Sequence, residues 1–489
     1  MLRQRVAAAM VDPARIAVNY GCMNKILLTR REAIAAGAAA MLVSPQTAKA
    51  AAEPVMLTAS VVPRTLPGNV GPSDLWLYND TIAPVLRIRR NELFTATFRN
   101  RLTEHSAIHW HGVRVPHAMD GVPYITQPPV QPGAGFTYKF APPDPGTFFF
   151  HPHCNTVEAL GRGLAGVLIV EDPRDQGLFD IEHVLALKDW RSRHDGSFED
   201  FLTDAGAARS GTFGNLRTVN GQALPVLQVP PGARVRLRIL NIDPTRIPML
   251  SLRGAARPLV IATDGNACEP FALNGWRLGP AQRADIAFIA PQMAGAEIVL
   301  EDVFSTRPRP LAKLLTAGQG LRSTKATLRL PDAELPEPDL KVATRLDVQL
   351  LAGSADPKLD AWAKENGVSL DEICLTQKVF WSINQQVWPG MAHDKLPPPL
   401  FELKSGRSYV MEMFNGTPHQ HPMHMHGHTF RVLSSSNRDL PAHWADTVLV
   451  RPKERIRIAF VAGEPGDWMF HCHIIEHQET GMMGYLRVA

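Results

Sequence analysis

Residues 466–482 read GDWMFHCHIIEHQETGM. The bulky apolar residues from Trp468 to Ile475 predict a buried strand. Because side chains alternate along a strand, His471 and His473 should face one side and Cys472 the other. One short peptide therefore offers ligands to two metal sites.

The Cys472 side of this strand has the composition of a blue-copper site. His477 and Met482 follow Cys472 after five and ten residues, so a returning loop could bring thiolate, imidazole and thioether to one ion. A further histidine, His421, precedes a second histidine cluster in the sequence. Two imidazoles, a thiolate and a weak axial methionine form the ligand field of an electron-transfer copper centre.

The composition is that of a globular protein: 45% of the 489 residues are hydrophobic and 20% are charged. This length predicts about three domains. Residues 1–50 hold seven Lys or Arg and two Asp or Glu, which leaves 44 basic against 45 acidic residues. A nearly neutral chain is not attracted to nucleic acid or to an anionic membrane, so we expect neither as a partner.

The N-terminal residues 1–50 predict an export leader. A basic Thr29-Arg30-Arg31 precedes the weakly apolar run Ala33 to Val43 and the small-residue stretch Ala48-Lys49-Ala50. The paired arginines favour the twin-arginine route and hence a periplasmic or secreted protein, with Met23 as the natural start. The alternative is a basic amphipathic helix that the mature protein retains. No other apolar run reaches the ~18 residues of a membrane span, so we expect no integral membrane segment after leader removal.

A strand pattern that ends in asparagine occurs three times. Residues 92–100, 233–241 and 407–415 each alternate apolar and polar side chains before Asn100, Asn241 and Asn415. Nine residues later the outer repeats carry a His-x-His pair, and the middle repeat carries Leu250-Ser251-Leu252. The first and third repeats thus keep metal ligands, and the second keeps only the scaffold.

These repeats predict an all-β chain of three consecutive Greek-key β-sandwich domains over residues 54–172, 173–335 and 336–489. Proline and charged residues across 306–338 favour a linker. Helical patterns at 356–366 and 370–374 favour an insertion beside the third domain.

Four His-x-His pairs supply eight imidazoles: His109 and His111, His151 and His153, His424 and His426, and His471 and His473. Strand alternation would turn both rings of a pair to one side, so strands from two domains can surround one cavity. Eight nitrogens exceed the needs of one or two tetrahedral zinc ions but suit three coppers with space for oxygen. A zinc hydrolase would also leave Cys472, His477 and Met482 without a purpose.

These motifs resemble the multicopper oxidases, the three-domain family of laccases and bacterial copper-tolerance oxidases, and the resemblance covers the whole mature chain. It implies three cupredoxin-like domains and four copper ions: one type 1, one type 2 and two type 3. Carried over by position, the type 1 ligands are His421, Cys472, His477 and Met482. The type 2 ligands are His109 and His424, and the type 3 ligands are His111, His151, His153, His426, His471 and His473.

The resemblance also implies the reaction and its catalytic residues. A small-molecule donor is oxidised one electron at a time, electrons pass from Cys472 to His471 and His473, and dioxygen is reduced to water. Asp120 matches an acid that assists proton delivery in relatives, although an aspartate before Gly121 is also typical of a turn. Relatives often have Glu directly after the second type 1 histidine. Here that residue is Gln478, which leaves the second acid open among Glu476, Glu479 and other groups.

The donor is predicted from the residues before His421. Relatives that oxidise cuprous ion have Asp and Met there, whereas this chain has residues 417–420, Thr-Pro-His-Gln. We therefore expect a monomeric, laccase-like enzyme for phenols or aromatic amines, which would reach the exposed edge of a type 1 histidine. The alternatives are a cuprous-ion oxidase and a non-catalytic cell-envelope scaffold.

The remaining cysteines leave disulfide pairing open. Cys22 would be lost with the leader. In an oxidising compartment two of Cys154, Cys268 and Cys374 could pair, and the sequence does not choose between them.

Overall fold

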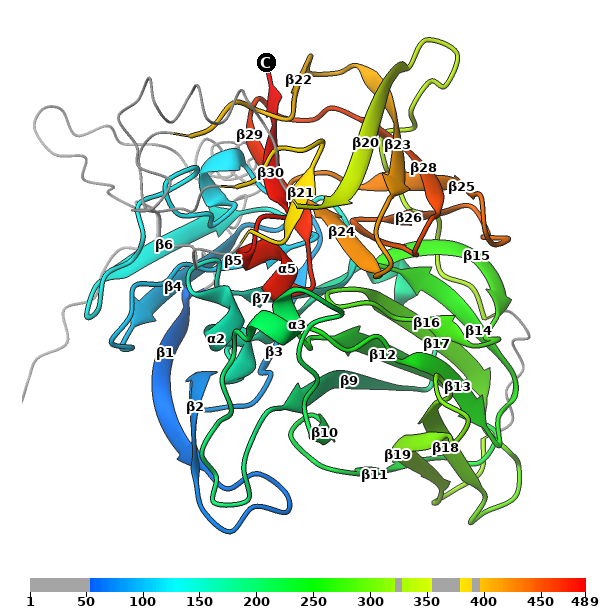
Figure 1. Ribbon diagram of the computed structural model, residues 1–489. Helices are drawn as coiled ribbons and strands as arrows, with labels where there is room; N and C mark the ends of the chain where they lie inside the picture. The colour runs from blue at the N-terminus through cyan, green and yellow to red at the C-terminus, as the bar shows by residue number, and fades with distance from the viewer. Residues whose placement is uncertain (1–52, 322–327, 354–378, 389–395) are drawn as a thin grey trace, which may run out of the picture. The chain divides into compact units, whose positions relative to one another are not determined.

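Six β-sheets carry the fold of this chain. The structure, a computed structural model, describes residues 53–321, 328–353, 379–388 and 396–489. The predicted leader at 1–50, the predicted helices at 356–366 and 370–374, and Cys374 lie outside these residues. In Figure 1 the chain runs from the blue and cyan strands through the green strands to the yellow and red ones.

The first pair of sheets forms a sandwich around a core that includes Leu57, Phe94, Trp110 and Phe148. One sheet has the order β2-β1-β4-β6 and the other β3-β8-β7-β5. The strands are β1 Val55–Arg64, β2 Ser73–Tyr78, β3 Val85–Arg89, β4 Phe94–Asn100, β5 His109–His111, β6 Gly135–Phe140, β7 Gly146–His151 and β8 Gly166–Glu171. The short helices η1 His117–Met119 and α2 Thr156–Gly161 lie in its loops.

The second pair of sheets packs around Leu237, Leu250, Ile286 and Leu300. The sheet orders are β10-β9-β12-β17-β14-β15 and β11-β19-β18-β13-β16. The elements are η2 Pro173–Asp175, β9 Ile181–Trp190, α3 Asp204–Ala207, β10 Leu216–Val219, β11 Val226–Val229, β12 Arg234–Asn241, β13 Met249–Arg253, β14 Ala256–Thr263, β15 Asn266–Ala272, β16 Trp276–Arg277, β17 Arg283–Ile289, β18 Glu297–Asp302 and β19 Arg309–Thr316.

The third pair of sheets packs around Met411, Phe430, Trp468 and Phe470. The sheet orders are β21-β20-β23-β28-β25-β26 and β22-β30-β29-β24-β27. The elements are β20 Thr344–Ala352, β21 Trp381–Ile383, β22 Phe401–Leu403, β23 Ser408–Asn415, β24 His421–Met425, β25 Phe430–Ser435, β26 His443–Ala445, β27 Thr447–Val450, β28 Arg455–Val461, β29 Gly466–Cys472, α5 Ile475–Glu479 and β30 Met483–Val488. The prediction of an all-β chain of three cupredoxin-like Greek-key sandwiches is thus confirmed.

The three repeated sequence patterns occupy the same place in each sandwich. They form β4, β12 and β23, and each of these strands pairs in parallel with the first strand of its sandwich. Their final residues Asn100, Asn241 and Asn415 are buried, and each side-chain amide donates to one backbone carbonyl in the loop that follows and to one in a segment 30 or more residues further along the chain. The asparagine therefore fixes the turn that leads to the ligand strand.

Two sequence predictions are wrong in detail. The segment 306–338 is not a linker throughout, because β19 takes residues 309–316 into a sheet between β11 and β18. The strand predicted from Trp468 to Ile475 ends at Cys472, and Ile475 begins α5. Apolar residues continue past Cys472 because α5 is also buried, so composition does not reveal where the strand stops.

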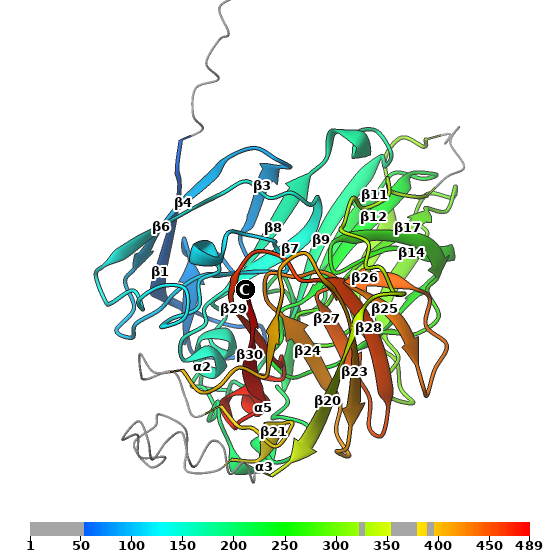
Figure 2. The same ribbon diagram turned by 90° about the horizontal axis from the view of Figure 1, so that it is seen from above.

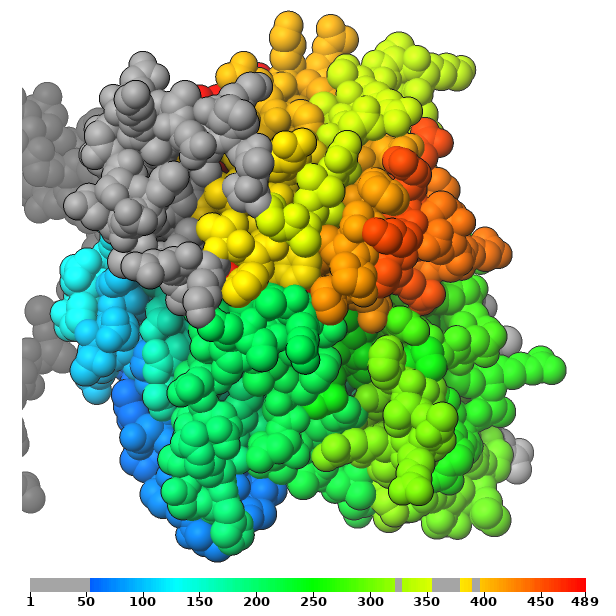
Figure 3. Space-filling view, in the orientation of Figure 1, coloured from blue at the N-terminus to red at the C-terminus, as the bar shows by residue number. Residues whose placement is uncertain are grey.

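The sandwiches contact one another through segments distant in sequence. The Trp381 indole of β21 donates to the Ala207 carbonyl at the end of α3, 2.6 Å away. Figure 3 shows the yellow segment that holds β21 directly against the green atoms of the second sandwich. Among the described residues, no helix has the length and apolar character needed to cross a bilayer.

Candidate metal centre

Cross-strand pairing brings the four His-x-His pairs together. In the first sandwich His109 of β5 lies opposite His151 of β7, and in the third His424 of β24 lies opposite His471 of β29. Figures 1 and 2 both place β24 and β29 close to β7. The second histidine of three pairs lies just beyond the end of its strand, and all eight side chains are buried.

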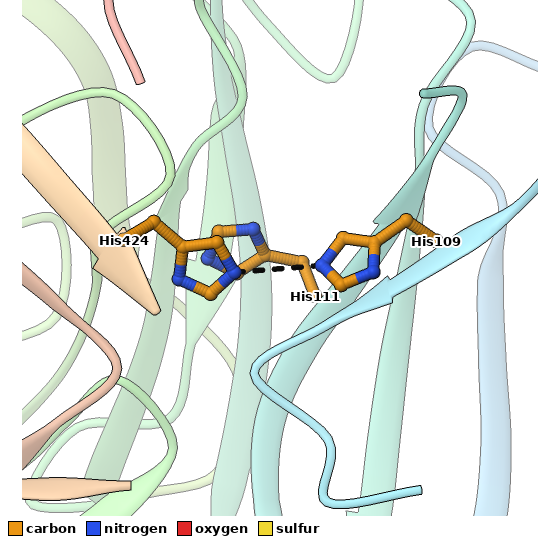
Figure 4. A group of neighbouring side chains, drawn as sticks. All are labelled: His109, His111 and His424. Carbon is orange, nitrogen blue, oxygen red and sulfur yellow. Dashed lines mark hydrogen bonds between the residues drawn. The ribbon is translucent and has the colours of Figure 1, made fainter. Parts of the chain in front are cut away.

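His109 and His424 face each other across the two sandwiches (Figure 4). Their Nε2 atoms are 3.4 Å apart. The ring of His111 stacks on that of His424 with centroids 3.6 Å apart. The resemblance assigns His109 and His424 to the type 2 ion, and it assigns His111 to the type 3 pair.

The other six imidazoles divide into two groups of three. His111, His151 and His473 form one group, and His153, His426 and His471 form the other. In each group, the ligand atoms lie within 4.8 Å of one another. Each group mixes residues of the first and third sandwiches, so neither sandwich alone holds a complete site.

A separate group lies on the other side of β29. His421 and His477 have their Nδ1 atoms 3.1 Å apart, and Cys472 Sγ is 3.6 and 3.7 Å from them. The Cys472 amide donates to the carbonyl of Met482, so the buried Met482 lies beside Cys472. His471, Cys472 and His473 thus connect this group to both three-histidine groups.

The outward nitrogens of these rings are held by oxygen acceptors. Nδ1 of His109, His151, His424 and His471 each lies 2.8–3.1 Å from a backbone carbonyl. A ring whose outer nitrogen donates in this way presents a lone pair on its inner nitrogen. The inner nitrogens are therefore the ones that can bind a metal.

This donor geometry fits metal ions. Facing lone pairs 3.1–3.5 Å apart repel each other unless a cation lies between them. Both ring nitrogens of His153 and of His473 are buried without a hydrogen-bond partner among the described residues. An unpaired buried polar atom costs about 1–3 kcal/mol, and a bound ion removes that cost. Imidazole and thiolate donors together suit copper.

The protonation states agree with this interpretation. Burial, reinforced by neighbouring imidazoles, lowers the pKa of six histidines far below the ordinary value: His111, His151, His153, His426, His471 and His473. Burial also lowers the pKa of His477 to about 3. Neutral imidazole is the form that binds a metal. Burial raises the pKa of the Cys472 thiol, so metal binding there must release a proton.

Asp120 lies where the resemblance places it. Its Oδ2 accepts a hydrogen bond from Nδ1 of His426 at 2.8 Å, and its carbonyl accepts one from Nδ1 of His109 at 2.8 Å. The residue is buried and ends the turn after η1. Asp120 therefore orients His426 through its carboxylate and His109 through its backbone carbonyl.

The sequence analysis missed a second acid, Asp446. Its Oδ1 is 3.1 Å from Nε2 of His111, and its carbonyl accepts a hydrogen bond from Nδ1 of His424. The buried Arg283 binds both of its carboxylate oxygens, at 2.9 and 2.5 Å, and holds its pKa well below the usual range against the opposing effect of burial. Asp446 lies between β26 and β27, away from every histidine motif, so no spacing signal marks it.

The acids near the C-terminal motif have other contacts. Glu476 is fully buried and accepts from Arg191 at 2.9 Å and from the Thr212 hydroxyl at 2.8 Å, which ties α5 to the second sandwich. Burial raises the pKa of Glu479 to about 7. Gln478 is buried, and its Oε1 has no hydrogen-bond partner among the described residues.

The two histidines that the resemblance assigns to the type 1 copper have no exposed edge, contrary to expectation. His421 and His477 are both fully buried. Nε2 of His477 donates to the Arg209 carbonyl at 2.7 Å, and Nε2 of His421 is 2.8 Å from the Thr417 hydroxyl. The segment after α3 therefore covers the outer face of this group, and Arg209 is the residue in contact with it.

The open question of disulfide pairing is answered for two cysteines. Cys154 and Cys268 are both free thiols. Cys154 and Cys268 therefore form no disulfide with each other, and Cys374 lies outside the described residues.

The chain matches known proteins over most of its length. Three family models described as multicopper oxidase match residues 62–175, 182–297 and 375–489. The solved multicopper oxidase of Pseudomonas thermotolerans is 37% identical with a TM-score of 0.79, covering 89% of this chain and 98% of that one.

Curated relatives give the same match. The multicopper oxidase MmcO of Mycobacterium tuberculosis is 28% identical, over 83% of this chain and 81% of its own length. A laccase of Pycnoporus cinnabarinus is 28% identical, over 82% of this chain and 83% of its own length.

Proposed function

Because this chain belongs to the multicopper oxidase family, we propose that it binds four copper ions and couples the oxidation of a small-molecule donor to the reduction of dioxygen to water. The observation that carries this proposal is the set of four ligand groups, three of which are joined through His471, Cys472 and His473. When bound, the copper ions supply one-electron oxidation at the cysteine site and four-electron reduction of dioxygen at the histidine sites.

The residues of the chain position these ions and manage protons. Carbonyls and the carboxylates of Asp120 and Asp446 fix the orientation of the imidazoles. Because the histidine side chains are buried, bulk water is excluded from their metal-binding nitrogens. Asp120, hydrogen-bonded to His426 within the cluster, is placed to pass protons towards dioxygen reduction.

Metal analysis of the purified protein tests the copper complement. We expect about four coppers per chain, a blue absorption band from the Cys472 thiolate and a near-ultraviolet shoulder from the histidine cluster. A protein that takes up about one copper, or none, after reconstitution would contradict the proposal and favour the scaffold alternative.

We further propose that phenols and aromatic amines are the donors. The residues before His421 supply no carboxylate or thioether for a cuprous ion, because positions 417–420 are Thr, Pro, His and Gln. His419 at this site is engaged with the Ser210 hydroxyl at 3.0 Å. A neutral aromatic donor needs only contact with the covering segment, whose Arg209 carbonyl is hydrogen-bonded to His477.

Side-by-side kinetics test this donor class. Oxidation of 2,6-dimethoxyphenol and of cuprous ion should be measured with and without excess cupric ion. We expect phenol turnover that does not depend on added cupric ion. Efficient cuprous turnover together with phenol activity only in the presence of cupric ion would reverse the assignment.

We also propose export by the twin-arginine route. Replacing Arg30 and Arg31 with lysine should leave folded protein in the cytoplasm. Cell fractionation measures this, and an unchanged periplasmic fraction would exclude the route.

A further inference from the structure

A cavity of about 240 Å³ lies between the second and third sandwiches. Its walls come from β15, β16 and the turn between them on one side, and from β26, β27 and the segment before β26 on the other. The volume suits one small organic molecule of a single ring. His477 and Arg209 are not part of the lining, so this cavity is distinct from the segment proposed to meet the electron donor.

Three arginines line this cavity: Arg277 of β16, Arg438, and Arg451 at the end of β27. Their mutual repulsion adds to the effect of burial, which lowers the pKa of Arg451 to about 10. Arg451 remains charged at neutral pH, because even this lowered value is far above 7. Three like charges held around one cavity attract an anion.

Among the residues that the structure describes, only Arg438 of these three arginines has a carboxylate partner. Nε of Arg438 donates to the fully buried Glu454 at 2.8 Å. Arg277 donates to the neutral amide of Gln420 at 3.0 Å and lies over the Phe304 ring. Within the described ranges neither Arg277 nor Arg451 forms an ion pair.

Arg451 is the least satisfied member of this group. Its Nε is buried and has no hydrogen-bond partner among the described residues. A buried guanidinium donor without a partner is costly, and a bound carboxylate would accept from it in the two-pronged geometry that arginine favours. The cavity also contains the carboxylate of Asp439, which is exposed to solvent, so the two half-buried guanidiniums of Arg277 and Arg451, which form no ion pair among the described residues, still outnumber it.

The remaining walls are apolar and aromatic. The Phe271 and Trp276 rings lie 5.0 Å apart, and the ring of His443 meets Trp276 edge-on at 5.7 Å. Leu440 and Val448 complete this side of the cavity. Aromatic walls of this kind favour a planar ring by stacking or edge contacts.

We propose that this cavity binds a small aromatic carboxylate, with the carboxylate on Arg451 and Arg277 and the ring against Trp276. The site is next to the metal centre. Leu449 in its wall pairs with Pro422 of β24, the residue after His421, and Arg277 holds Gln420, the residue before it. The site is separate from the oxidase reaction and does not depend on which donor that reaction uses.

Calorimetric titration of the copper-loaded protein with benzoate tests the proposal. We expect binding with a dissociation constant on the order of 1 mM or tighter, as for a ligand of this size. Added salt should weaken it, because the attraction is largely electrostatic. Benzamide, which has the same shape without the charge, and inorganic phosphate, which has charge without the ring, should each bind at least about ten-fold more weakly.

Variants then assign the site. Arg451→Gln should weaken benzoate binding at least about ten-fold. Arg451→Lys should weaken it less, because lysine keeps the positive charge but cannot donate two parallel hydrogen bonds to one carboxylate. The exposed Arg407 is the matched control, and Arg407→Gln should leave the dissociation constant unchanged. Removing one of three repelling charges should not lower the melting temperature, so loss of binding will not reflect unfolding; the blue absorption of each variant checks this.

Three results would overturn the proposal. The first is no heat of binding with about 10 mM benzoate, an excess over the expected dissociation constant. The second is equal binding by wild type and Arg451→Gln, which would place benzoate elsewhere. The third is equal affinity for benzamide or phosphate, which would remove the carboxylate or the ring from the recognition.

Discussion

At the scale of single residues, the metal centre depends on which atom each side chain presents. Every ring with an oxygen acceptor on its outer nitrogen directs the other nitrogen inward, so the tautomer is set before an ion arrives. Cys472 is the exception, because burial keeps its thiol protonated until a cation replaces the proton.

Cys472→Ser should remove the blue absorption and donor oxidation and reduce the copper content from about four to about three per chain, because a hydroxyl lacks the soft sulfur of the site. Absorption spectra and metal analysis of the purified variant measure this. Cys268→Ser, at a half-buried free cysteine of the second sandwich, is the control and should keep all copper. A blue Cys472→Ser protein would remove Cys472 from the ligand set.

Asp446→Asn should destabilise the protein and weaken the cluster together. It leaves the buried Arg283 without its closest carboxylate, a change that typically costs about 3–5 kcal/mol. It also loosens His111 and His424, for which about a 10–100-fold loss of metal affinity is typical. Denaturant unfolding and copper titration measure the two effects. The exposed Asp439→Asn should change neither, and unaltered stability of Asp446→Asn would show that the buried pair is unimportant.

His443 gives a pH dependence outside the ligand set. Burial lowers its pKa to about 4, whereas the unfolded chain has the ordinary value of 6.5. Below pH 6.5 the unfolded state therefore binds the extra proton, and stability falls by about 1.4 kcal/mol per pH unit until pH 4.

The variant His443→Asn isolates this contribution. Its Nδ2 can replace Nδ1 of histidine as donor to the Pro441 carbonyl, but it does not titrate. The stability advantage of wild type over the variant should shrink by about 1.4 kcal/mol between pH 7.5 and 5.5, at equal copper loading. A constant difference across this range would contradict a buried neutral His443.

At the scale of elements, the ligand strand β5 contacts a turn that has no space for a side chain at Gly121. Gly121 follows Asp120 with φ +81°, and an added Cβ would lie 1.8 Å from the carbonyl oxygen of Ile108. Ile108 directly precedes β5, so this turn fixes both the acid and the strand that carries His109 and His111.

Gly121→Ala should therefore displace the turn, lower stability by more than about 3 kcal/mol and reduce copper at the cluster. Gly133→Ala is the matched control, because Gly133 has φ +78° but nothing within 4 Å of an added Cβ. That control should cost only about 1–3 kcal/mol of backbone strain. Equal melting temperatures for the two variants would show that the contact of the added Cβ with Ile108 does not lower stability.

At the scale of the whole molecule, the histidine cluster joins the sandwiches. The first and third supply the ligands, and the second supplies Arg283, which donates to the Thr147 carbonyl of the first and to Asp446 of the third. Binding at a shared site stabilises the assembled state, because the separated sandwiches cannot hold the ion.

Removal of copper should thus lower the melting temperature of the entire fold. Each site at a free copper concentration of 100 times its dissociation constant contributes about 2.7 kcal/mol. Scanning calorimetry of the loaded, chelated and reconstituted protein measures the change. The contrary result would be that copper shifts only a small unfolding transition at low temperature and leaves the main one unchanged. It would indicate that the sandwiches unfold independently of the cluster.

The sequence by itself determined the elements and the ligand types. Alternating apolar residues before Asn100, Asn241 and Asn415 predicted the strands correctly, because strand periodicity is local and survives in any chain context. The same local spacing identified His-x-His pairs and the Cys472 motif. Leu250 and Leu252, at the positions of the ligand histidines, predicted that the second repeat keeps only the scaffold, and both side chains lie in the apolar core of the second sandwich.

Only the tertiary structure decided which side chains meet. Asp446 contacts His111 across 335 residues, and Arg209 covers His477 across 268. Such contacts have no periodicity, because they arise from the packing of whole sandwiches and not from the geometry of one strand. For the same reason the sequence did not show that β29 ends at Cys472, that both type 1 histidines are buried, or that three arginines converge between two sandwiches.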